Sequence, residues 1–460
     1  MTLTLSLLLA LAQRISAHAD ALSAAAARLA HPPRSLSPHP SNPTSLLPPG
    51  APAAARAEQT ALRDALTEAQ ILATDATEFV PELAVANNLF ASVRWLCHFD
   101  IPGALPLDPG GPGGSYSSRS YADVAKHAGV PEHQLRSIAR MAMLAGFLAE
   151  PSPDADALCH SRLSAAMAEQ PQLLEWARFV TSSSAPMVSR MVEATERWGD
   201  DRAANHTAYA IAWDTDQTVF GHVAAHPELQ ASWASYMRAT TQSEVMSLAH
   251  LVDAWRPGWE RLQARRGVLV DVGGGAGHVS TALARAFPGL RAVVQDRREV
   301  IERAQRENAP GLRAEGLPLA FQPHDFFAPQ PVRPSGWDRS DAGDVYLLRQ
   351  ILHDWGDEQA VLILRHLAAA LEASGPHARL VIMDTILPPP GSVSRSDEAR
   401  LRVRDLTMLQ AHNAYERSMA QWERLLADAH PALRIRTTIQ PFKSLMAVIE
   451  VAWDPSPPSA

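Results

Sequence analysis

The chain contains few cysteines, few lysines and no long apolar run. Its two cysteines, Cys97 and Cys159, are too few for a disulfide framework, a four-cysteine zinc site or an iron–sulfur cluster, so we expect a reducing compartment, the cytoplasm. Lys126 and Lys443 are its two lysines, which leaves few candidates for Schiff-base chemistry. No uncharged apolar run reaches about 18 residues, and we therefore expect no membrane-spanning helix.

Positive charge is also scarce relative to negative charge. Lysine and arginine number 41 against 49 aspartates and glutamates, which gives a formal net charge of −8. Nucleic acids and anionic membranes bind mainly to basic surfaces, so we expect neither as a partner. Over 460 residues, 46% hydrophobic and 20% charged residues are typical of a globular protein of two or three packed units.

The first 55 residues form two segments of contrasting composition. Residues 1–30 are rich in leucine at helical spacing, which predicts an amphipathic helix that serves as a dimerisation arm. The sequence Ala17-His18-Ala19 resembles a signal-peptidase site, so a targeting segment remains the alternative. Residues 31–55 contain eight prolines among small and polar residues, a composition that predicts a semi-extended linker.

Residues 56–250 are predicted to be a mainly helical domain. Within it, residues 121–148 indicate two helices separated by a turn at Gly129-Val130-Pro131, and a return run follows near residues 160–163. This is the outline of a winged helix. Winged helices often bind DNA, but apolar residues crowd the second helix here, which favours a packing role over DNA recognition.

After Trp255 the pattern changes to short β-rich runs that alternate with helical stretches. We predict an α/β domain with a mostly parallel sheet over residues 251–453, followed by a disordered tail at residues 454–460. The runs predicted as strands are residues 267–272, 291–295, 344–348 and 379–383.

A glycine-rich turn follows the first of these strands. Gly273, Gly275 and Gly277 lie between a strand and a helix, where backbone can approach a ligand closely. The run does not fit the G-x-G-x-x-G spacing of dinucleotide-binding turns. Asp296 ends the next strand, where a carboxylate can accept hydrogen bonds from both hydroxyls of a ribose. Together these features indicate an adenosyl ligand without a pyrophosphate.

Two further residues bring proton chemistry to the same edge of the sheet. His353 follows the third predicted strand, and ligands of open α/β sheets bind at the carboxyl ends of the strands. Ser418 with Gln421 forms a capping-box signal for the last helix, which leaves Glu416 in the loop just ahead of that helix. A carboxylate in that loop can reach the site.

Several motifs, taken together, resemble a known enzyme family. The run from Asp271 to Gly277 resembles the first motif of class I S-adenosylmethionine-dependent methyltransferases. His353-Asp354-Trp355, the strand end at residues 381–388, and Asp405-Leu406-Thr407-Met408 followed by Tyr415-Glu416-Arg417-Ser418 are similar in order and spacing to the caffeate-type and fungal-type O-methyltransferase family, over roughly residues 60–453.

This resemblance carries implications for fold, cofactor and assembly. It implies a Rossmann-like class I methyltransferase domain of α/β type, preceded by a mainly α-helical winged-helix dimerisation domain. It also implies S-adenosyl-L-methionine as cofactor, S-adenosyl-L-homocysteine as product, and a homodimer in which each subunit can close the pocket of the other.

The resemblance assigns the catalytic groups as well. A phenol with a pKa of about 10 is mostly protonated at neutral pH, so methylation of its oxygen needs a base. His353 would be that general base, flanked by Glu416 and Asp384, either of which could fix the imidazole tautomer. Plant relatives usually carry glutamate at the position of Asp384, so the side chain here is shorter by one methylene.

Ligand contacts also follow from the resemblance. The cofactor contacts would be Gly273, Gly275, Asp296, Asp325, Phe326 and Arg349. Relatives often have lysine at the last of these positions, and a guanidinium is bulkier than an ammonium. The substrate contacts would be Met408, Asn413, Trp233 and Met237. Large side chains at helical spacing, such as the last two, are also typical of a helix core.

The sequence therefore predicts an S-adenosylmethionine-dependent O-methyltransferase that methylates a phenolic hydroxyl of an aromatic specialised metabolite, with polyketide-like phenols as the leading candidates. No metal is expected, because no ligands at helical spacing follow His353-Asp354. Two alternatives stay open: a winged-helix regulator or sensor that retains the cofactor fold, and an N- or C-methyltransferase of the same fold. The identity and regiochemistry of the acceptor stay open as well.

Overall fold

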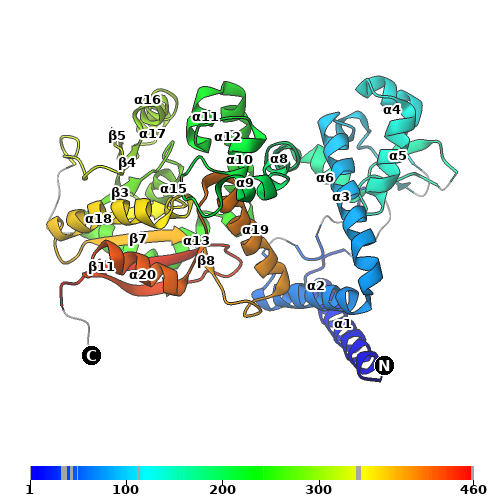
Figure 1. Cartoon of the computed structure of the whole chain (residues 1–460), viewed down its shortest axis with the longest axis horizontal. Coiled ribbons are helices and arrows are strands. Elements are labelled where there is room, and N and C mark those ends of the chain that lie inside the picture. The colour runs from blue at the N-terminus through cyan, green and yellow to red at the C-terminus, as the bar shows by residue number, and fades with distance from the viewer. Residues whose placement is uncertain are drawn as a thin grey trace. The chain divides into compact units, whose positions relative to one another are not determined.

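The computed structural model divides the chain into two units (Figure 1). The first consists of Met1–Pro186, His226–Thr240 and Ser394–Ser396, and the second of Met187–Ala225, Thr241–Val393 and Asp397–Ala460. The structure describes residues 2–456 apart from 33–38, 42–44, 49, 112–113, 153, 242 and 338–342. Parts of the predicted linker and residues 457–460 of the predicted tail thus lie outside the described residues. The domain boundaries drawn from the sequence stay a prediction beside this division.

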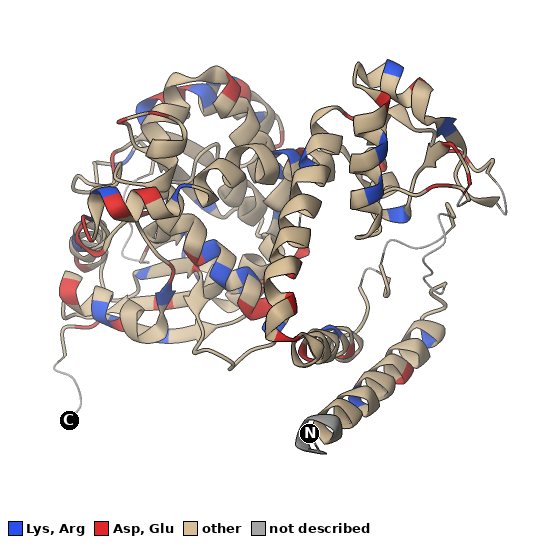
Figure 2. Ribbon diagram, turned by 45° about the vertical axis from the view of Figure 1, so that its right-hand side comes forward, with Lys and Arg blue, Asp and Glu red and all other residues tan. Residues whose placement is uncertain are grey.

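The first unit begins with two long helices that pack against each other, α1 (Thr2–Arg28) and α2 (Ala53–Ala73). Charged side chains are few along α1, which Figure 2 shows as a mostly tan helix beside the N-terminus. Leu47 and Ala51 of the predicted linker are buried in one cluster with Leu22 of α1. Leu47 and Ala51 therefore pack onto α1, because their side chains supply apolar surface to bury, while the linker as a whole stays a prediction.

Helix α3 (Ala76–His98) differs along its length. It begins with a capping box formed by Asp75 and Glu78, which satisfies two of the free N–H groups of the first turn. Its last turn is buried, with Leu96 and Cys97 in the core of the unit. Its first four turns leave large apolar side chains exposed, namely Phe79, Val80, Leu83, Val85 and Phe90. We call these five residues the α3 apolar surface.

The winged-helix outline predicted from the sequence is present in the first unit. Its elements are β1 (Ser118–Ser120), α4 (Tyr121–Ala128), α5 (Glu132–Met143) and β2 (Ala157–Cys159), with β1 and β2 paired antiparallel. Gly129 ends α4 in the left-handed region at φ 68°, which a residue without a Cβ adopts without strain. The apolar side of α5 is buried against α3 and α4. Cys97 and Cys159 are both free and buried.

One short helix, η1 (Pro102–Ala104), lies between α3 and the winged-helix elements, and a series of further helices follows β2 in the chain before the first strand of the large sheet. These further helices are α6 (Arg162–Glu169), α7 (Pro171–Phe179), η3 (Val180–Ser184), α8 (Ala185–Val188), α9 (Met191–Trp198), α10 (Ala208–Ala212), α11 (Val219–Ala225), α12 (Pro227–Thr241), η4 (Glu244–Met246), α13 (Ala249–Ala254) and α14 (Arg256–Ala264). Among the described residues, no helix is both long enough and apolar enough to cross a bilayer.

The second unit is built on a seven-stranded sheet in the order β10-β11-β7-β6-β3-β4-β5. The strands are β3 (Val268–Val272), β4 (Arg291–Asp296), β5 (Leu319–Pro323), β6 (Val345–Arg349), β7 (Arg379–Asp384), β10 (Leu433–Ile439) and β11 (Ala447–Trp453). β3 to β7 run parallel, and β10 and β11 pair antiparallel at one edge. The predicted α/β class is therefore confirmed.

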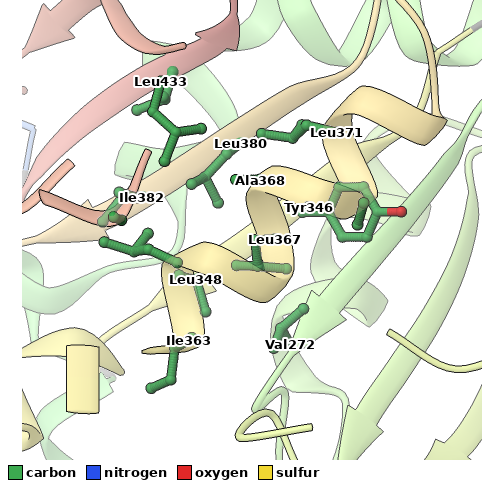
Figure 3. Packing of buried hydrophobic residues seen from close by; sticks show 14 of the residues in the cluster. Val272, Tyr346, Leu348, Ile363, Leu367, Ala368, Leu371, Leu380, Ile382 and Leu433 are labelled. Carbon is green, nitrogen blue, oxygen red and sulfur yellow. The ribbon is translucent and has the colours of Figure 1, made fainter. Parts of the chain in front are cut away.

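Helices cover both faces of this sheet. α18 (Asp357–Ala373) and α20 (Met419–Ala429) pack on one face, and α13, α14 and α15 (His278–Ala286) pack on the other. The unit also contains α16 (Arg298–Glu307), α17 (Ala309–Ala314), α19 (Arg395–His412), a small parallel pair β8 (Ile386–Leu387) and β9 (Arg417–Ser418), and the turn η5 (Leu352–Asp354). Side chains alternate between the two faces along each strand. Figure 3 shows Leu367 and Leu371 of α18 packed over Tyr346 and Leu380 of the sheet. The rigid core places the carboxyl ends of β3, β4, β6 and β7 at one edge.

Candidate active site

The glycine turn after β3 adopts a conformation that only glycine accommodates easily. Gly273, Gly275 and Gly277 have φ values of 73°, 58° and 83°, in the left-handed region that L side chains rarely adopt. A Cβ on Gly273 would lie 2.6 Å from Cδ1 of Ile351, whereas nothing lies within 4 Å of a Cβ on Gly275. The turn is therefore closed on the side of Gly273 and open at Gly275.

Asp296, at the end of β4, is tied to this turn. The backbone N–H of Gly275 donates to Asp296 Oδ2 at 2.8 Å, and the N–H of Arg297 donates to Oδ1 at 2.8 Å. Burial raises the pKa of Asp296, and these two N–H groups oppose the rise. Each carboxylate oxygen keeps a second lone pair. Asp296 can thus still accept from a diol beside the open side of the turn.

Asp325 and Phe326 lie next to the same turn. The backbone N–H of His324 donates to the carbonyl of Asp296 at 2.8 Å, which holds the segment beside the end of β4. Asp325 Oδ1 accepts from the N–H of Phe327 at 3.0 Å. The ring of Phe326 is 3.6 Å from the Cβ position of Gly273. The predicted cofactor contacts around the turn are thus neighbours in space.

Arg349 ends β6 beside the turn and is partly buried. It donates to the carbonyl of Met246 at 3.1 Å, while its Nε has no hydrogen-bond partner among the described residues. Burial lowers the pKa of Arg349 to about 10 despite the opposing charge of Asp271. Burial also raises the pKa of Asp271 to about 6, although this carboxylate accepts from Ser280 Oγ at 2.7 Å. The free Nε is a donor for the polar end of a ligand.

His353, Glu416 and Asp384 come together although they lie on three separate segments. His353 is in the turn η5 after β6, Asp384 ends β7, and Glu416 precedes β9. Nδ1 of His353 is 3.0 Å from Glu416 Oε1 and 3.5 Å from Asp384 Oδ1. A carboxylate only accepts, so the hydrogen-bonded pair assigns a hydrogen to Nδ1 and leaves Nε2 to take up a proton. Glu416 is thus the closer partner of the ring.

The loop that bears His353 is held by a buried arginine that was not predicted from the sequence. Arg417 is fully buried and donates to the carbonyls of Leu352 at 2.7 Å and Trp355 at 2.8 Å. It also pairs with the carboxylate of Asp357 at 2.9 Å. The capping box of Ser418 and Gln421 that was predicted for the last helix is confirmed. These contacts fix the position of the His353 turn next to Glu416.

The charges of this cluster shift one another. Burial disfavours the imidazolium, but three carboxylates outweigh it and raise the pKa of His353 to about 9, with Asp384 contributing most, then Asp354 and Glu416. Burial would raise the pKa of Glu416, yet the positive charges of His353 and Arg404 dominate and hold it at about 2. Burial raises the pKa of Asp384 to about 6, against the opposing charge of His353. The resting cluster is therefore an imidazolium–carboxylate pair.

Arg404 of α19 also belongs to this cluster and was missed in the sequence. Its guanidinium is 3.2 Å from Glu416 Oε1, and its Nε donates to Thr385 Oγ1 at 3.0 Å. Arginines recur at positions 400, 402 and 404, and composition does not distinguish the inward one from its exposed neighbours. Arg404 could have been singled out only by knowing which side of α19 faces the end of β7.

The other ring nitrogen of His353 faces a second histidine across a carboxylate. Asp354 Oδ1 is 3.6 Å from His353 Nε2 and 3.5 Å from His412 Nε2. His412 is buried, and burial lowers its pKa. Its ring lies beside Phe220, 5.0 Å between centroids. The side of His353 that is free to take a proton thus faces a neutral imidazole, a carboxylate and an aromatic ring.

The predicted substrate contacts differ in what they touch. Met408 is half-buried on α19. Asn413 donates to the carbonyls of Asp201 and Ala203 at 2.6 and 3.2 Å and lines a small cavity of about 70 Å³. Trp233 and Met237 belong to the first unit, where Trp233 packs edge-to-face on Phe179 and Met237 is exposed. The amide of Asn413 is therefore engaged by backbone, and all four contacts stay predictions.

The His353 cluster also has the ligand types of a metal site. His353, Asp384 and Glu416 offer ligand atoms within 4.8 Å of one another. The guanidinium of Arg404, however, already supplies the positive charge beside Glu416 Oε1, and a second cation there would be repelled. The expectation of a metal-free site stays a prediction.

Comparisons with known proteins agree with this geometry. Residues 203–430 match the O-methyltransferase domain family. The chain is 40% identical to the O-methyltransferase VdtC of Byssochlamys spectabilis over 408 residues, 88% of each chain, and 40% identical to the O-methyltransferase pgmB of Aspergillus terreus over 416 residues, 90% of this chain and 89% of that one.

The fold is also that of solved structures. OxaC in complex with S-adenosylhomocysteine and oxaline superposes with a TM-score of 0.70 at 20% identity, covering 96% of this chain and all of that one. The open glycine turn, Asp296 and the free Nε of Arg349 fit an adenosyl cofactor with a polar tail. The chain belongs to the family of S-adenosylmethionine-dependent O-methyltransferases.

Proposed function

We propose that this enzyme methylates a phenolic hydroxyl of an aromatic specialised metabolite, with a polyketide-like phenol as acceptor and His353 as general base. The observation that carries the proposal is the hydrogen bond from His353 Nδ1 to the buried carboxylate of Glu416. Bound S-adenosylmethionine supplies the methyl group from its sulfonium and leaves S-adenosylhomocysteine. OxaC, a solved structure with this fold, is in complex with S-adenosylhomocysteine and oxaline, which supports a small-molecule acceptor.

The basicity of His353 suits a phenol. Its pKa is raised to about 9, within about one unit of a phenol, whereas an unperturbed imidazole would be about 3.5 units weaker than the phenolate. A base close in pKa to its substrate transfers the proton without a large uphill step. The same base is still far too weak for an aliphatic alcohol, which favours phenols among oxygen acceptors.

Glu416 sets the tautomer and the orientation of the His353 ring. Nδ1–H of His353 stays on Glu416 Oε1, which presents the lone pair of Nε2 to the acceptor hydroxyl. As the phenolic proton arrives at Nε2, the ring gains a positive charge beside an ionised carboxylate. Asp384 lies 0.5 Å farther from Nδ1 than Glu416 (3.5 against 3.0 Å) and has a raised pKa. We assign it the weaker orienting role.

The ligand contacts of the proposal follow the same edge of the sheet. Asp296 would accept from the ribose, Asp325 from the adenine amine, and Arg349 would donate to the polar tail through its free Nε. Gly273, Gly275 and Phe326 complete the cofactor set. Met408, Asn413, Trp233 and Met237 are proposed to line the acceptor pocket, with the helical and methyltransferase domains bounded as predicted from the sequence.

We also propose a homodimer formed through the first unit. The α3 apolar surface exposes Phe79, Val80 and Leu83 by 54 to 68%. Large apolar side chains clustered on one helix are typical of a surface that another chain covers. Leu7 and Leu9 of α1 are exposed in the same unit. A second copy of this chain is the occupant expected for a symmetric enzyme of this kind.

The proposal is tested with cofactor binding and turnover measured separately. Calorimetry with S-adenosylhomocysteine comes first, followed by mass detection of a gained methyl group on a panel of phenols, anilines and aliphatic alcohols. His353→Gln is expected to bind the product with unchanged affinity and to lose about 100- to 10,000-fold in kcat on phenols. His377→Gln, at an exposed position of the same unit, should behave as the wild type. Full phenol activity of His353→Gln would overturn the proposal, and binding without any turnover would favour the sensor alternative.

A further inference from the structure

Arg404 contacts His353, its carboxylate partner Glu416 and the neighbouring Thr385. Its guanidinium is 3.2 Å from Glu416 Oε1, 3.4 Å from His353 Nδ1 and 3.0 Å from Thr385 Oγ1. It also lies 3.7 Å from Met246 Sδ. The side chain is only 17% exposed, so water screens these charges poorly.

The contact between Arg404 and His353 is not an ordinary hydrogen bond. Nδ1 already carries the hydrogen that Glu416 accepts, so the guanidinium cannot also donate to that nitrogen. Arg404 is therefore present at 3.4 Å as a permanent positive charge. A positive charge at this distance disfavours the imidazolium and favours the neutral ring.

The surroundings of His353 explain why such a charge is needed. The groups that face the ring are Asp354 in its own turn, Asp384 at the end of β7, Glu416 before β9, and Arg404 and His412 on α19. Three of these are carboxylates, and all three favour the imidazolium. Asp384 Oδ2 and Glu416 Oε2 have no hydrogen-bond partner among the described residues. Without Arg404 the ring would face three carboxylates and one neutral imidazole.

We propose that Arg404 is a positioning residue of the methyl-transfer reaction, whose guanidinium holds Glu416 on Nδ1 of His353 and offsets part of the charge of the surrounding carboxylates, so that a larger fraction of the ring is neutral and able to act as base. The inference rests on the proposed role of His353 as base. The proton that Nε2 takes from the acceptor must leave to solvent before the next turnover, and Arg404 favours that release. It touches neither acceptor nor cofactor in this role.

The test compares Arg404→Gln, which removes the charge, with Arg404→Lys, which keeps a charge without the fork. Arg400→Gln is the matched control, because Arg400 lies one turn earlier on α19, is 44% exposed and pairs with Asp397. For each variant, histidine labelled with ¹³C in the ring gives the titration of His353 in the S-adenosylhomocysteine complex, assigned by its absence in His353→Gln. The pH profile of kcat/KM on an accepted phenol is measured in parallel.

We expect Arg404→Gln to move both the His353 titration and the acid limb of kcat/KM upward by about one unit or more. At pH 7.5 this lowers kcat/KM about tenfold, and higher pH restores most of it. Arg404→Lys should shift the titration by less than half as much, and Arg400→Gln should not shift it. If Arg404→Gln does not bind S-adenosylhomocysteine, the titration of Arg404→Met, which also removes the charge, replaces it: an upward shift supports the inference and an unshifted titration overturns it.

The inference is overturned if Arg404→Gln loses activity equally at every pH while the His353 titration stays where it is in the wild type, since that is the behaviour of a purely structural residue. It is also overturned if Arg400→Gln shifts the titration as far. Failure of the proposed function looks different, because His353→Gln would then keep its activity whatever Arg404 does.

Discussion

The α3 helix of the first unit and the strand ends of the second unit place side chains in opposite surroundings. In α3, Phe79 and Leu83 are more than half exposed, although burial of such side chains would contribute about 1.5–3 kcal/mol each. At the strand ends, His353 and Glu416 are buried with their charges, although burial of charge is unfavourable. Neither arrangement stabilises an isolated chain. The difference supports the two proposals made above, that α3 takes part in assembly and that the strand ends hold the catalytic groups.

The largest effect is expected at the strand ends, when the ionised carboxylate beside His353 is removed. Glu416→Gln keeps the shape of the side chain but cannot stabilise the imidazolium, so we expect kcat to fall about 100- to 1,000-fold. Glu423→Gln, at an exposed position of α20, is the control. Steady-state rates and calorimetry with S-adenosylhomocysteine separate turnover from binding. A loss of less than threefold would show that burying this charge does not serve catalysis.

A second large effect is expected on stability at the same strand ends. Arg417→Met leaves the carbonyls of Leu352 and Trp355 without their buried donor, which should lower the free energy of unfolding by about 3 kcal/mol. Arg424→Met, at an exposed position one residue beyond Glu423, should change it little. Urea unfolding followed by fluorescence measures both. Equal stability of the two variants would contradict the role of Arg417 in holding the base.

Polar substitutions in α3 test whether its exposed apolar side chains form a dimer interface. Phe79→Ser with Leu83→Ser removes two members of the α3 apolar surface, and we expect the proposed dimer to become a monomer at micromolar concentration. Val332→Ser, at a residue that is 90% exposed in the second unit, should leave the mass unchanged. Light scattering after gel filtration gives the mass of each. A wild type that is already monomeric would contradict the assembly role of α3.

The smallest effect is expected at Asp384. Its carboxylate is farther from Nδ1 than that of Glu416, and its raised pKa leaves it partly protonated near neutral pH. Asp384→Asn should therefore lower kcat by only about three- to tenfold. Asp384→Glu, which restores the longer side chain of the plant relatives, should recover part of this loss. If Asp384→Asn is impaired more than Glu416→Gln, the assignment of the two carboxylates must be exchanged.

The parts of the fold that follow from local pattern were predictable. The strand–glycine–helix run from β3 into α15, the acid at the end of β4 and the capping box at Ser418 each need only a few consecutive residues, and the structure contains all three. The strands β5, β10 and β11 were not predicted, because β5 is half-buried with no alternation and the other two form an antiparallel edge. Their pairing depends on the sheet already being present.

The candidate site divides in the same way. His353 was predictable because it follows a strand at the ligand-binding edge of a sheet, and its pairing with Glu416 was implied by the family resemblance. Arg404, Arg417 and His412 were not predicted, because their importance depends on which way a side chain points in the folded protein. Arg417 lies directly beside Glu416 in the sequence, yet nothing local distinguishes it from an exposed arginine. The role of each of these three residues depends on contacts with segments that are distant in the sequence.

The dependence of kcat/KM on pH for an accepted phenol tests the central claim most directly. The pKa of His353 is raised to about 9, so only about 3% of the ring is neutral at pH 7.5. A base must be neutral to act, and kcat/KM should therefore rise about tenfold per pH unit and level off near pH 9. A profile that is flat from pH 6 to 10, or that levels off near pH 6.5, would contradict a buried imidazole held between Glu416 and Asp384 as the base.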